Sequence, residues 1–127
     1  MNPRVLVIDH DRNARRVVER TLQRAGYRVI SAFDGAEGLR LWRHTRPDLV
    51  ITEIVMPEKD GIETMLEIRK LEPKAKILAM TGYIQRGAVN FLEIIRSLGA
   101  DGVLAKPFVG EQLLAEVDAC LQLPAVA

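Results

Sequence analysis

Only one cysteine, Cys120, occurs in the chain, which excludes an intramolecular disulfide and a cysteine-based metal cluster. We expect Cys120 to act as a small apolar residue on a C-terminal helix. No stretch approaches the roughly 20 apolar residues that a membrane-spanning helix needs, and the N-terminus lacks the apolar run of a signal peptide. These absences favour a cytoplasmic protein that has no membrane partner.

Two glycine-rich phosphate-binding motifs, GxxxxGKS/T and GxGxxG, are also absent. Their absence counts against a domain that binds a nucleotide or a flavin, although that reading stays open as an alternative. The net charge of +1 argues against non-specific binding of nucleic acid. Residues 1–47 hold ten arginines, no lysine and five acidic residues, whereas residues 48–127 hold eight basic and twelve acidic residues. This asymmetry fits either two faces that bind partners or an ordinary solvated surface.

The 127 residues, of which 48% are hydrophobic, suit one compact domain. We assign residues 1–123 to this domain and residues 124–127 to a C-terminal tail. Short apolar runs predict strands at 4–8, 27–32, 48–52, 76–80 and 102–105. Helical spacing of apolar residues predicts helices that begin near residues 12, 35, 61, 88 and 111. Five alternations of strand and helix predict an α/β fold, in which a doubly wound, five-stranded parallel sheet has helices on both faces. Right-handed crossovers favour the flavodoxin-like (βα)5 strand order 2-1-3-4-5.

The first of these helices has a clear division between apolar and basic positions. Asp11 is placed to cap its N-terminus. Its inner stripe is predicted to contain Ala14, Val17, Val18, Thr21, Leu22 and Ala25. Arg12, Arg16 and Arg20 recur every four residues on its outer face.

Polar side chains follow the carboxyl ends of four predicted strands. Asp9, His10 and Asp11 follow the first strand, Glu53 ends the third, Thr81 follows the fourth and Lys106 follows the fifth. In an open parallel sheet these ends meet at one edge, where ligands bind. Carboxylates hold hard divalent cations, and a lysine with a hydroxyl can hold phosphoryl oxygens. The set therefore points to phosphoryl chemistry.

Several ordered segments resemble the receiver domain of bacterial two-component response regulators. These are VLVID at Val5–Asp9, PDLVITEIVMPEKDGIE at Pro47–Glu63, ILAMTG at Ile77–Gly82 and LGADGVLAKPF at Leu98–Phe108. The resemblance covers essentially the whole chain. It implies a signalling module that is not an enzyme and has at most residual self-phosphorylation and dephosphorylation chemistry. The implied partners are a histidine kinase, a phosphotransfer protein or a downstream protein. We expect a monomer or a weak homodimer, and no nucleic-acid partner.

The resemblance also implies roles for individual positions. Glu53 stands at the phosphoacceptor, where the family has aspartate, and Thr81 and Lys106 stand at the positions that contact the phosphoryl group. The Mg²⁺ ligands correspond to Asp9, His10, Glu53 and the Val55 carbonyl. The switch pair corresponds to Thr81 and Val103, and the structural turns to Pro57, Gly61 and the cis-proline Pro107. The kinase-docking helix carries Arg12, Arg16 and Arg20.

Three of these positions depart from the family pattern. Glu53 is one methylene longer than aspartate, so its carboxylate reaches roughly 1.5 Å farther. His10 replaces a metal-binding acid and weakens a Mg²⁺ site, because Mg²⁺ prefers oxygen ligands. We leave open whether His10 is a polar loop residue, a protonated substitute for the cation or a ligand for a transition metal. Val103 replaces the aromatic ring that rotates in the family.

We therefore expect a stand-alone receiver module that works by binding other proteins, with Glu53 paired to Lys106 in imitation of the phosphorylated state. The imitation is partial, because a phosphoryl group carries about −1.5 to −2 charge. The alternative is a conventional receiver, phosphorylated by a histidine kinase on Glu53 or on a nearby aspartate.

Overall fold

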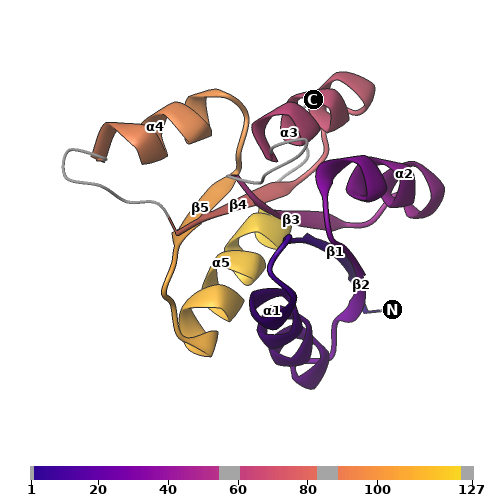
Figure 1. The fold of residues 1–127 in the computed structure, drawn as a ribbon, viewed down its shortest axis with the longest axis vertical. Helices are drawn as coiled ribbons and strands as arrows, with labels where there is room; N and C mark the ends of the chain where they lie inside the picture. The colour runs from indigo at the N-terminus through magenta and orange to yellow at the C-terminus, as the bar shows by residue number, and fades with distance from the viewer. Residues whose placement is uncertain (1, 55–60, 83–88, 124–127) are drawn as a thin grey trace.

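The computed structural model describes residues 2–54, 61–82 and 89–123. Their elements alternate along the chain (Figure 1). The strands are β1 (Arg4–Ile8), β2 (Arg28–Ala32), β3 (Leu49–Glu53), β4 (Ile77–Thr81) and β5 (Gly102–Ala105). The helices are α1 (Arg12–Arg24), α2 (Gly35–Thr45), α3 (Gly61–Leu71), α4 (Val89–Ser97) and α5 (Gly110–Gln122). The predicted order of five strands and five helices is confirmed, with element ends displaced by a residue or two.

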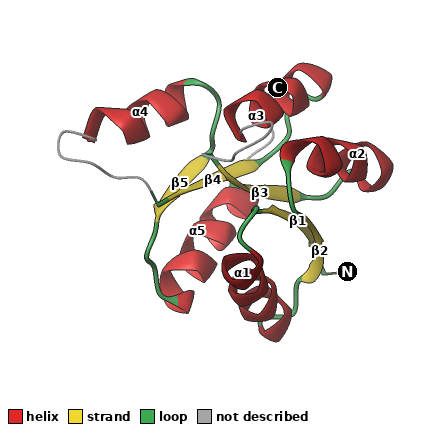
Figure 2. Cartoon of the chain, viewed as in Figure 1, coloured by secondary structure: helices red, strands yellow, loops and turns green. Residues whose placement is uncertain are grey.

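The five strands form one parallel sheet in the order β2-β1-β3-β4-β5, as the sequence predicts. Helices α1 and α5 cover one face, and α2, α3 and α4 cover the other (Figure 2). Alternate residues of each strand point to opposite faces, so Val5 and Val7 pack with α1 and α5 while Leu6 and Ile8 pack with the other helices. Two hydrophobic clusters on either side of the sheet therefore hold its carboxyl edge in place.

Side-chain caps fix the start of two helices beside that edge. Asp11 accepts hydrogen bonds from the backbone N–H groups of Asn13 at 2.9 Å and Ala14 at 3.2 Å, which confirms the predicted cap of α1. These bonds stabilise the charged carboxylate and lower the pKa of Asp11. Asp34 caps α2 in the same way through the Glu37 N–H, at 2.8 Å.

The buried stripe of α1 is narrower than the sequence predicts. Val18 and Leu22 are buried, but Val17 is 61% exposed and Ala25 also faces solvent. Consecutive helical residues are rotated by about 100°, so Val17 and Val18 cannot both face the sheet. The predicted outer face is confirmed, since Arg12, Arg16 and Arg20 are all exposed.

Arg69 links the segment that precedes β4 to the segment that precedes β5. Its guanidinium donates to the backbone carbonyls of Ala75 and Gly99 and to the Asp101 carboxylate, at 3.1 Å for Asp101. Asp101 also accepts the Ile77 N–H at 2.8 Å. These contacts fix the register at which β4 and β5 enter the sheet, and so where Thr81 and Lys106 emerge.

Cys120 is buried on α5, as expected for a structural cysteine, and burial raises the pKa of its thiol to about 11. None of the described helices combines the length and apolar character that crossing a bilayer requires.

The position of Val17 gives a matched pair of substitutions on one helix. Leu22→Ala removes a fully buried side chain and should lower the free energy of unfolding by about 2–5 kcal/mol. Val17→Ala should change it by no more than about 0.5 kcal/mol, because Val17 faces solvent. Urea denaturation measures both. A loss for Val17→Ala as large as that for Leu22→Ala would contradict the arrangement of α1.

Candidate functional site

The sheet brings together polar groups that lie far apart in the sequence. Asp9 directly follows β1, Glu53 is the last residue of β3, Thr81 is the last residue of β4, and Lys106 directly follows β5. Asp9, Glu53 and Thr81 are all buried. The Lys106 N–H donates to the Thr81 carbonyl at 2.8 Å, which continues the pairing of β4 and β5 to the site. The predicted gathering at the carboxyl edge is therefore confirmed for these four residues.

Lys106 is the cation of this cluster. Its Nζ donates a hydrogen bond to Asp9 Oδ2 at 2.8 Å. The same Nζ lies 2.5 Å from Glu53 Oε2 in an ion pair, although this oxygen makes no hydrogen bond with good geometry to the described residues. One ammonium thus joins carboxylates from two strands, whereas the sequence indicated only its pairing with Glu53.

Hydrogen bonds fix both the side chain and the backbone of Asp9. Its Oδ1 accepts the Asp11 N–H at 2.9 Å, and its backbone carbonyl accepts Nη1 of Arg15 at 2.8 Å. The Asp9 N–H donates to the Ala32 carbonyl at 3.1 Å. Sequence reasoning missed Arg15, because it lies one position before the regular arginine stripe and only the turn after β1 brings the two together.

Burial and the neighbouring charges shift the ionisation of both partners. Burial disfavours the charged carboxylate and raises the pKa of Glu53, and the nearby Lys106 ammonium only partly opposes this. For Lys106 burial acts to lower the pKa, but the contacts with Asp9 and Glu53 outweigh it, so the pKa is raised. Lys106 is therefore charged at neutral pH.

Gly61 packs directly against the backbone of Glu53. A Cβ on Gly61 would lie 1.9 Å from the Glu53 carbonyl oxygen and 2.8 Å from the Ile54 Cα. The Gly61 N–H also donates to the Ile54 carbonyl at 3.0 Å. Only glycine permits this approach of α3 to the end of β3, which gives the predicted turn residue a physical role. The other predicted turn residue of this loop, Pro57, lies outside the described residues.

His10 stands at the rim of the site. Its side chain is 46% exposed, and Nδ1 is 3.9 Å from Asp9 Oδ1, too far for a hydrogen bond. Val103 lies in β5, buried in the cluster beneath α2, α3 and α4. The Lys106–Pro107 peptide bond is cis, as the sequence comparison implied. The switch role assigned to Thr81 and Val103 stays a prediction.

The described residues do not fit a Mg²⁺ site well. Mg²⁺ takes about six oxygen ligands in near-octahedral geometry. Here the Lys106 ammonium contacts Asp9 Oδ2 and Glu53 Oε2, and His10 supplies nitrogen where the family has an acid. No three acidic, histidine or cysteine side chains in the part of the chain that the structure covers are grouped so as to hold a metal ion. The predicted carbonyl ligand, Val55, falls outside that part.

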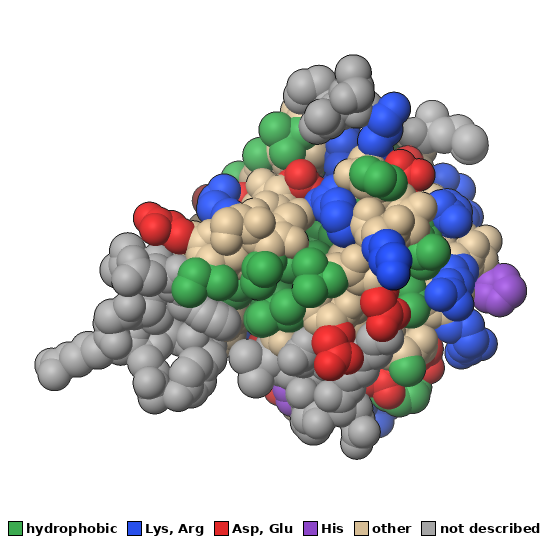
Figure 3. Space-filling model, turned by 90° about the horizontal axis from the view of Figure 1, so that it is seen from above, with side chains coloured by type: hydrophobic (Ala, Val, Ile, Leu, Met, Phe, Trp, Pro, Cys, Tyr) green, Lys and Arg blue, Asp and Glu red, His purple; other side chains and the backbone are tan. Residues whose placement is uncertain are grey.

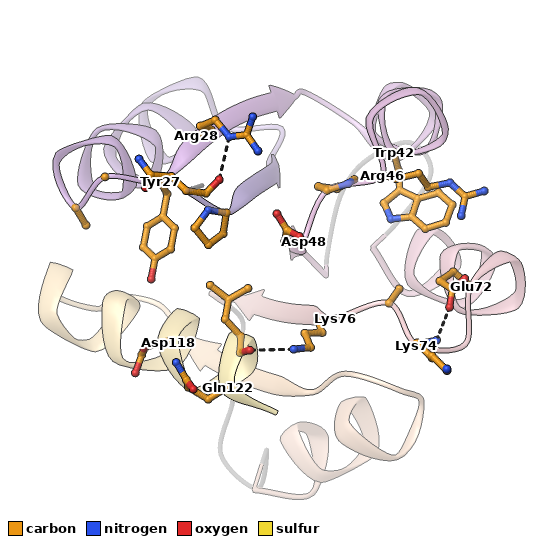
Figure 4. A pocket seen from close by; sticks show the side chains of 17 residues that line it. Tyr27, Arg28, Trp42, Arg46, Asp48, Glu72, Lys74, Lys76, Asp118 and Gln122 are labelled. Atoms are coloured by element: carbon orange, nitrogen blue, oxygen red, sulfur yellow. Dashed lines mark hydrogen bonds between the residues drawn. The ribbon is translucent and has the colours of Figure 1, made fainter. Parts of the chain in front are cut away.

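A large hollow lies at the opposite, amino edge of the sheet (Figure 4). Its volume is about 930 Å³, and it contains none of the residues of the carboxyl-edge cluster. Several of its polar groups already have partners. Lys76 Nζ donates to the Leu121 carbonyl at 2.9 Å, and the Arg46 guanidinium sits 4.1 Å from the centre of the Trp42 ring. Its size alone does not make this hollow the site of phosphoryl chemistry.

Basic side chains gather on one side of the face shown in Figure 3, the side on which Figure 1 places α2. Arg40 and Arg43 of α2 are exposed there. The predicted docking residues Arg12, Arg16 and Arg20 lie on the exposed side of α1, and their contact with a partner stays a prediction.

A family model described as the response regulator receiver domain matches residues 5–118. The chain belongs to this family. Receiver domains are signalling modules of two-component systems that interact with histidine kinases or phosphotransfer proteins, are generally not enzymes and generally bind Mg²⁺ at the phosphorylation site.

Individual relatives agree with this assignment. The response regulator MprA of Mycobacterium sp. (strain KMS) is 38% identical over 122 residues, which are 96% of this chain and 52% of that protein. The transcriptional regulatory protein PrrA of Mycobacterium leprae is 36% identical over 121 residues, 95% of this chain and 51% of that protein. The receiver domain thus spans about half the length of these curated relatives.

Two solved structures share the fold along nearly their whole length. The chemotaxis protein CheY4 of Vibrio cholerae has a TM-score of 0.85 and 32% identity, with 93% of this chain and 98% of that chain covered. A CheY-like receiver domain from Methanospirillum hungatei has a TM-score of 0.86 and 26% identity, with 95% and 94% covered. The flavodoxin-like fold of the receiver is therefore confirmed.

The close approach at Gly61 predicts a strong effect of one methyl group. Gly61→Ala should lower the free energy of unfolding by about 1–3 kcal/mol or more, which is the cost typical of overpacking. The reason is that backbone atoms of β3 must move to make room for the added methyl group. Gly82→Ala is the matched control, since among the described residues its Cβ would meet only the flexible Lys106 side chain, at 3.6 Å. Equal stability of the two variants in denaturant titrations would contradict this packing.

The raised pKa of Glu53 predicts a pH-dependent stability. The folded protein binds this proton more tightly than the unfolded chain, so the contribution is present below the ordinary pKa of 4.5 and is lost as pH rises through the folded pKa. Wild type should therefore lose stability relative to Glu53→Gln as pH rises above 4.5. Thermal unfolding over a pH series measures the difference, with Glu111→Gln as a control for loss of a charge elsewhere. A difference that grows in favour of wild type would refute the direction of the shift.

Proposed function

We propose that this receiver domain signals by binding other proteins and does so without an aspartyl phosphate. The observation that carries the proposal is the 2.5 Å ion pair between Glu53 Oε2 and Lys106 Nζ. Lys106 is the group that the family uses beside the phosphoryl oxygens, and here a carboxylate of the protein itself occupies it. The domain then keeps one arrangement of the site whether or not a phosphodonor is present.

The length of the Glu53 side chain supports this proposal. The acceptor carboxylate reaches roughly 1.5 Å farther than that of an aspartate. In-line transfer is sensitive to position, and a displacement of about 1 Å can lower its rate by about 10²-fold. Glu53 is also only 5% exposed, so its carboxylate is poorly placed to meet a donor. These features make Glu53 a better partner for Lys106 than a nucleophile.

The residue at the predicted switch position, Val103, also supports the proposal. Val103 has no ring to exchange between buried and exposed positions, and it packs in the core beneath α2, α3 and α4. A change at the acceptor is therefore poorly transmitted to the surface. We infer that a partner recognises one fixed surface, and the exposed arginines of α1 are the candidate contact for a histidine kinase or phosphotransfer protein.

Two finer points remain predictions. Stand-alone action and the absence of a nucleic-acid partner were expected from the sequence, but the chain spans about half the length of the curated relatives it matches.

A conventional receiver, phosphorylated on Glu53 or a nearby aspartate, is the alternative. Asp9 is buried and bound to Lys106, and Asp11 is occupied in capping α1, so neither aspartate is a free acceptor.

Treatment with acetyl phosphate separates the two functions. Wild type, incubated with acetyl phosphate and MgCl₂, should gain no phosphoryl group in an intact-mass measurement. The double variant His10→Asp/Glu53→Asp carries the family's residue types at the acceptor and metal positions and should gain one phosphoryl group. His10→Asp/Glu53→Gln controls for modification elsewhere. A stoichiometric phosphoryl adduct on Glu53 of the wild type would defeat the proposal.

A further inference from the structure

We propose that the Lys106 ammonium is the resident cation of this site and holds Asp9 and Glu53 together without a divalent metal ion. The inference shares the Glu53–Lys106 contact with the proposed function but has its own test. It concerns what balances the charge of the carboxyl edge, a task that Mg²⁺ generally performs in receivers.

The carboxylates of Asp9 and Glu53 already contact a cation of the protein. Nζ of Lys106 is 2.8 Å from Asp9 Oδ2 and 2.5 Å from Glu53 Oε2. The other Asp9 oxygen accepts the Asp11 N–H at 2.9 Å. A metal ion that bound both carboxylates through the oxygens facing Lys106 would have to displace the ammonium from them. At Asp9 Oδ2 and Glu53 Oε2 the two cations therefore compete.

The charge of the cluster also disfavours a divalent cation. Two carboxylates next to one ammonium leave at most one uncompensated negative charge in the cluster. A divalent cation placed there would be repelled by Lys106 at short range, and that repulsion is strong where water is largely excluded. Asp9 has no exposed surface and Glu53 is only 5% exposed, so solvent screens this repulsion weakly.

The remaining ligand position of the site is also unsuited to Mg²⁺. His10 offers a nitrogen in place of a second acid, and its side chain lies outward, 3.9 Å from Asp9 Oδ1. Protonated His10 was one candidate for a substitute cation. The geometry favours Lys106 for that role, because Lys106 contacts both carboxylates directly whereas His10 is beyond hydrogen-bonding distance of Asp9.

The ammonium also has a mechanical consequence. It links residues at the ends of three strands, β1, β3 and β5, of which β5 is not adjacent to either of the others in the sheet. In a metal-dependent receiver such a link would vary with the cation concentration. Here the link is part of the polypeptide and is present at any cation concentration.

Metal titrations of the whole chain test the proposal. MgCl₂ is added to isotope-labelled wild type and to His10→Asp/Glu53→Asp, and the amide signals of Asp9, Asp11 and Glu53 are followed by NMR. The wild-type signals should not move at millimolar Mg²⁺, and those of the double variant should shift and saturate. Wild-type signals that saturate at sub-millimolar Mg²⁺ would overturn the proposal.

A second variant tests the role of the ammonium itself. Lys106→Met leaves Asp9 and Glu53 without their cation, so its melting temperature should rise with added MgCl₂ or MnCl₂, whereas that of wild type should stay constant. If Lys106→Met does not fold, Lys106→Gln is used in its place. Melting of a folded variant that ignores both metals would show that Lys106 does not compete with them and would overturn the proposal.

The outcomes are distinct from those for the proposed function. Wild type that binds Mg²⁺ tightly but gains no phosphoryl group would overturn this inference and leave the proposed function intact. Wild type that gains a phosphoryl group on Glu53 but is stable and spectroscopically unchanged across the Mg²⁺ series would do the reverse.

Discussion

One ammonium group determines how the carboxyl edge of this sheet is organised. Lys106 contacts carboxylates from β1 and β3, and its own position depends on the pairing of β5 with β4. Burying two carboxylates so close together would be unfavourable without such a partner. The sheet order places β1 and β3 side by side and β5 beyond β4. This order allows one lysine to contact both carboxylates.

The proposed pairing of Glu53 with Lys106 also accounts for the length of the Glu53 side chain. An aspartate at this position would leave a gap of roughly one methylene between its carboxylate and the place that Glu53 reaches. Glutamate closes that gap, and Gly61 keeps α3 tight against the end of β3 behind it. Glu53 is thus part of the packing of the domain, and the fold around it is that of a receiver.

Much of the fold could be predicted because the apolar pattern of each element is strong. The strand order and the gathering of Asp9, Glu53, Thr81 and Lys106 follow from five short apolar runs and the rules for parallel sheets. The sequence could not decide between Val17 and Val18, since both are apolar and only contact with the sheet selects one. The sequence also could not show that Lys106 contacts two carboxylates, because this depends on the distances between the ends of three strands.

Trp42 is the only tryptophan of the chain, and it lies far from this chemistry. Its ring is 2% exposed and is covered by Arg46 at the amino edge of the sheet (Figure 4). Its fluorescence emission therefore reports unfolding of the core. It is insensitive to ions or adducts at the opposite, carboxyl edge of the sheet. Spectroscopists who follow this intrinsic fluorophore will see the domain melt without seeing what its carboxylates hold.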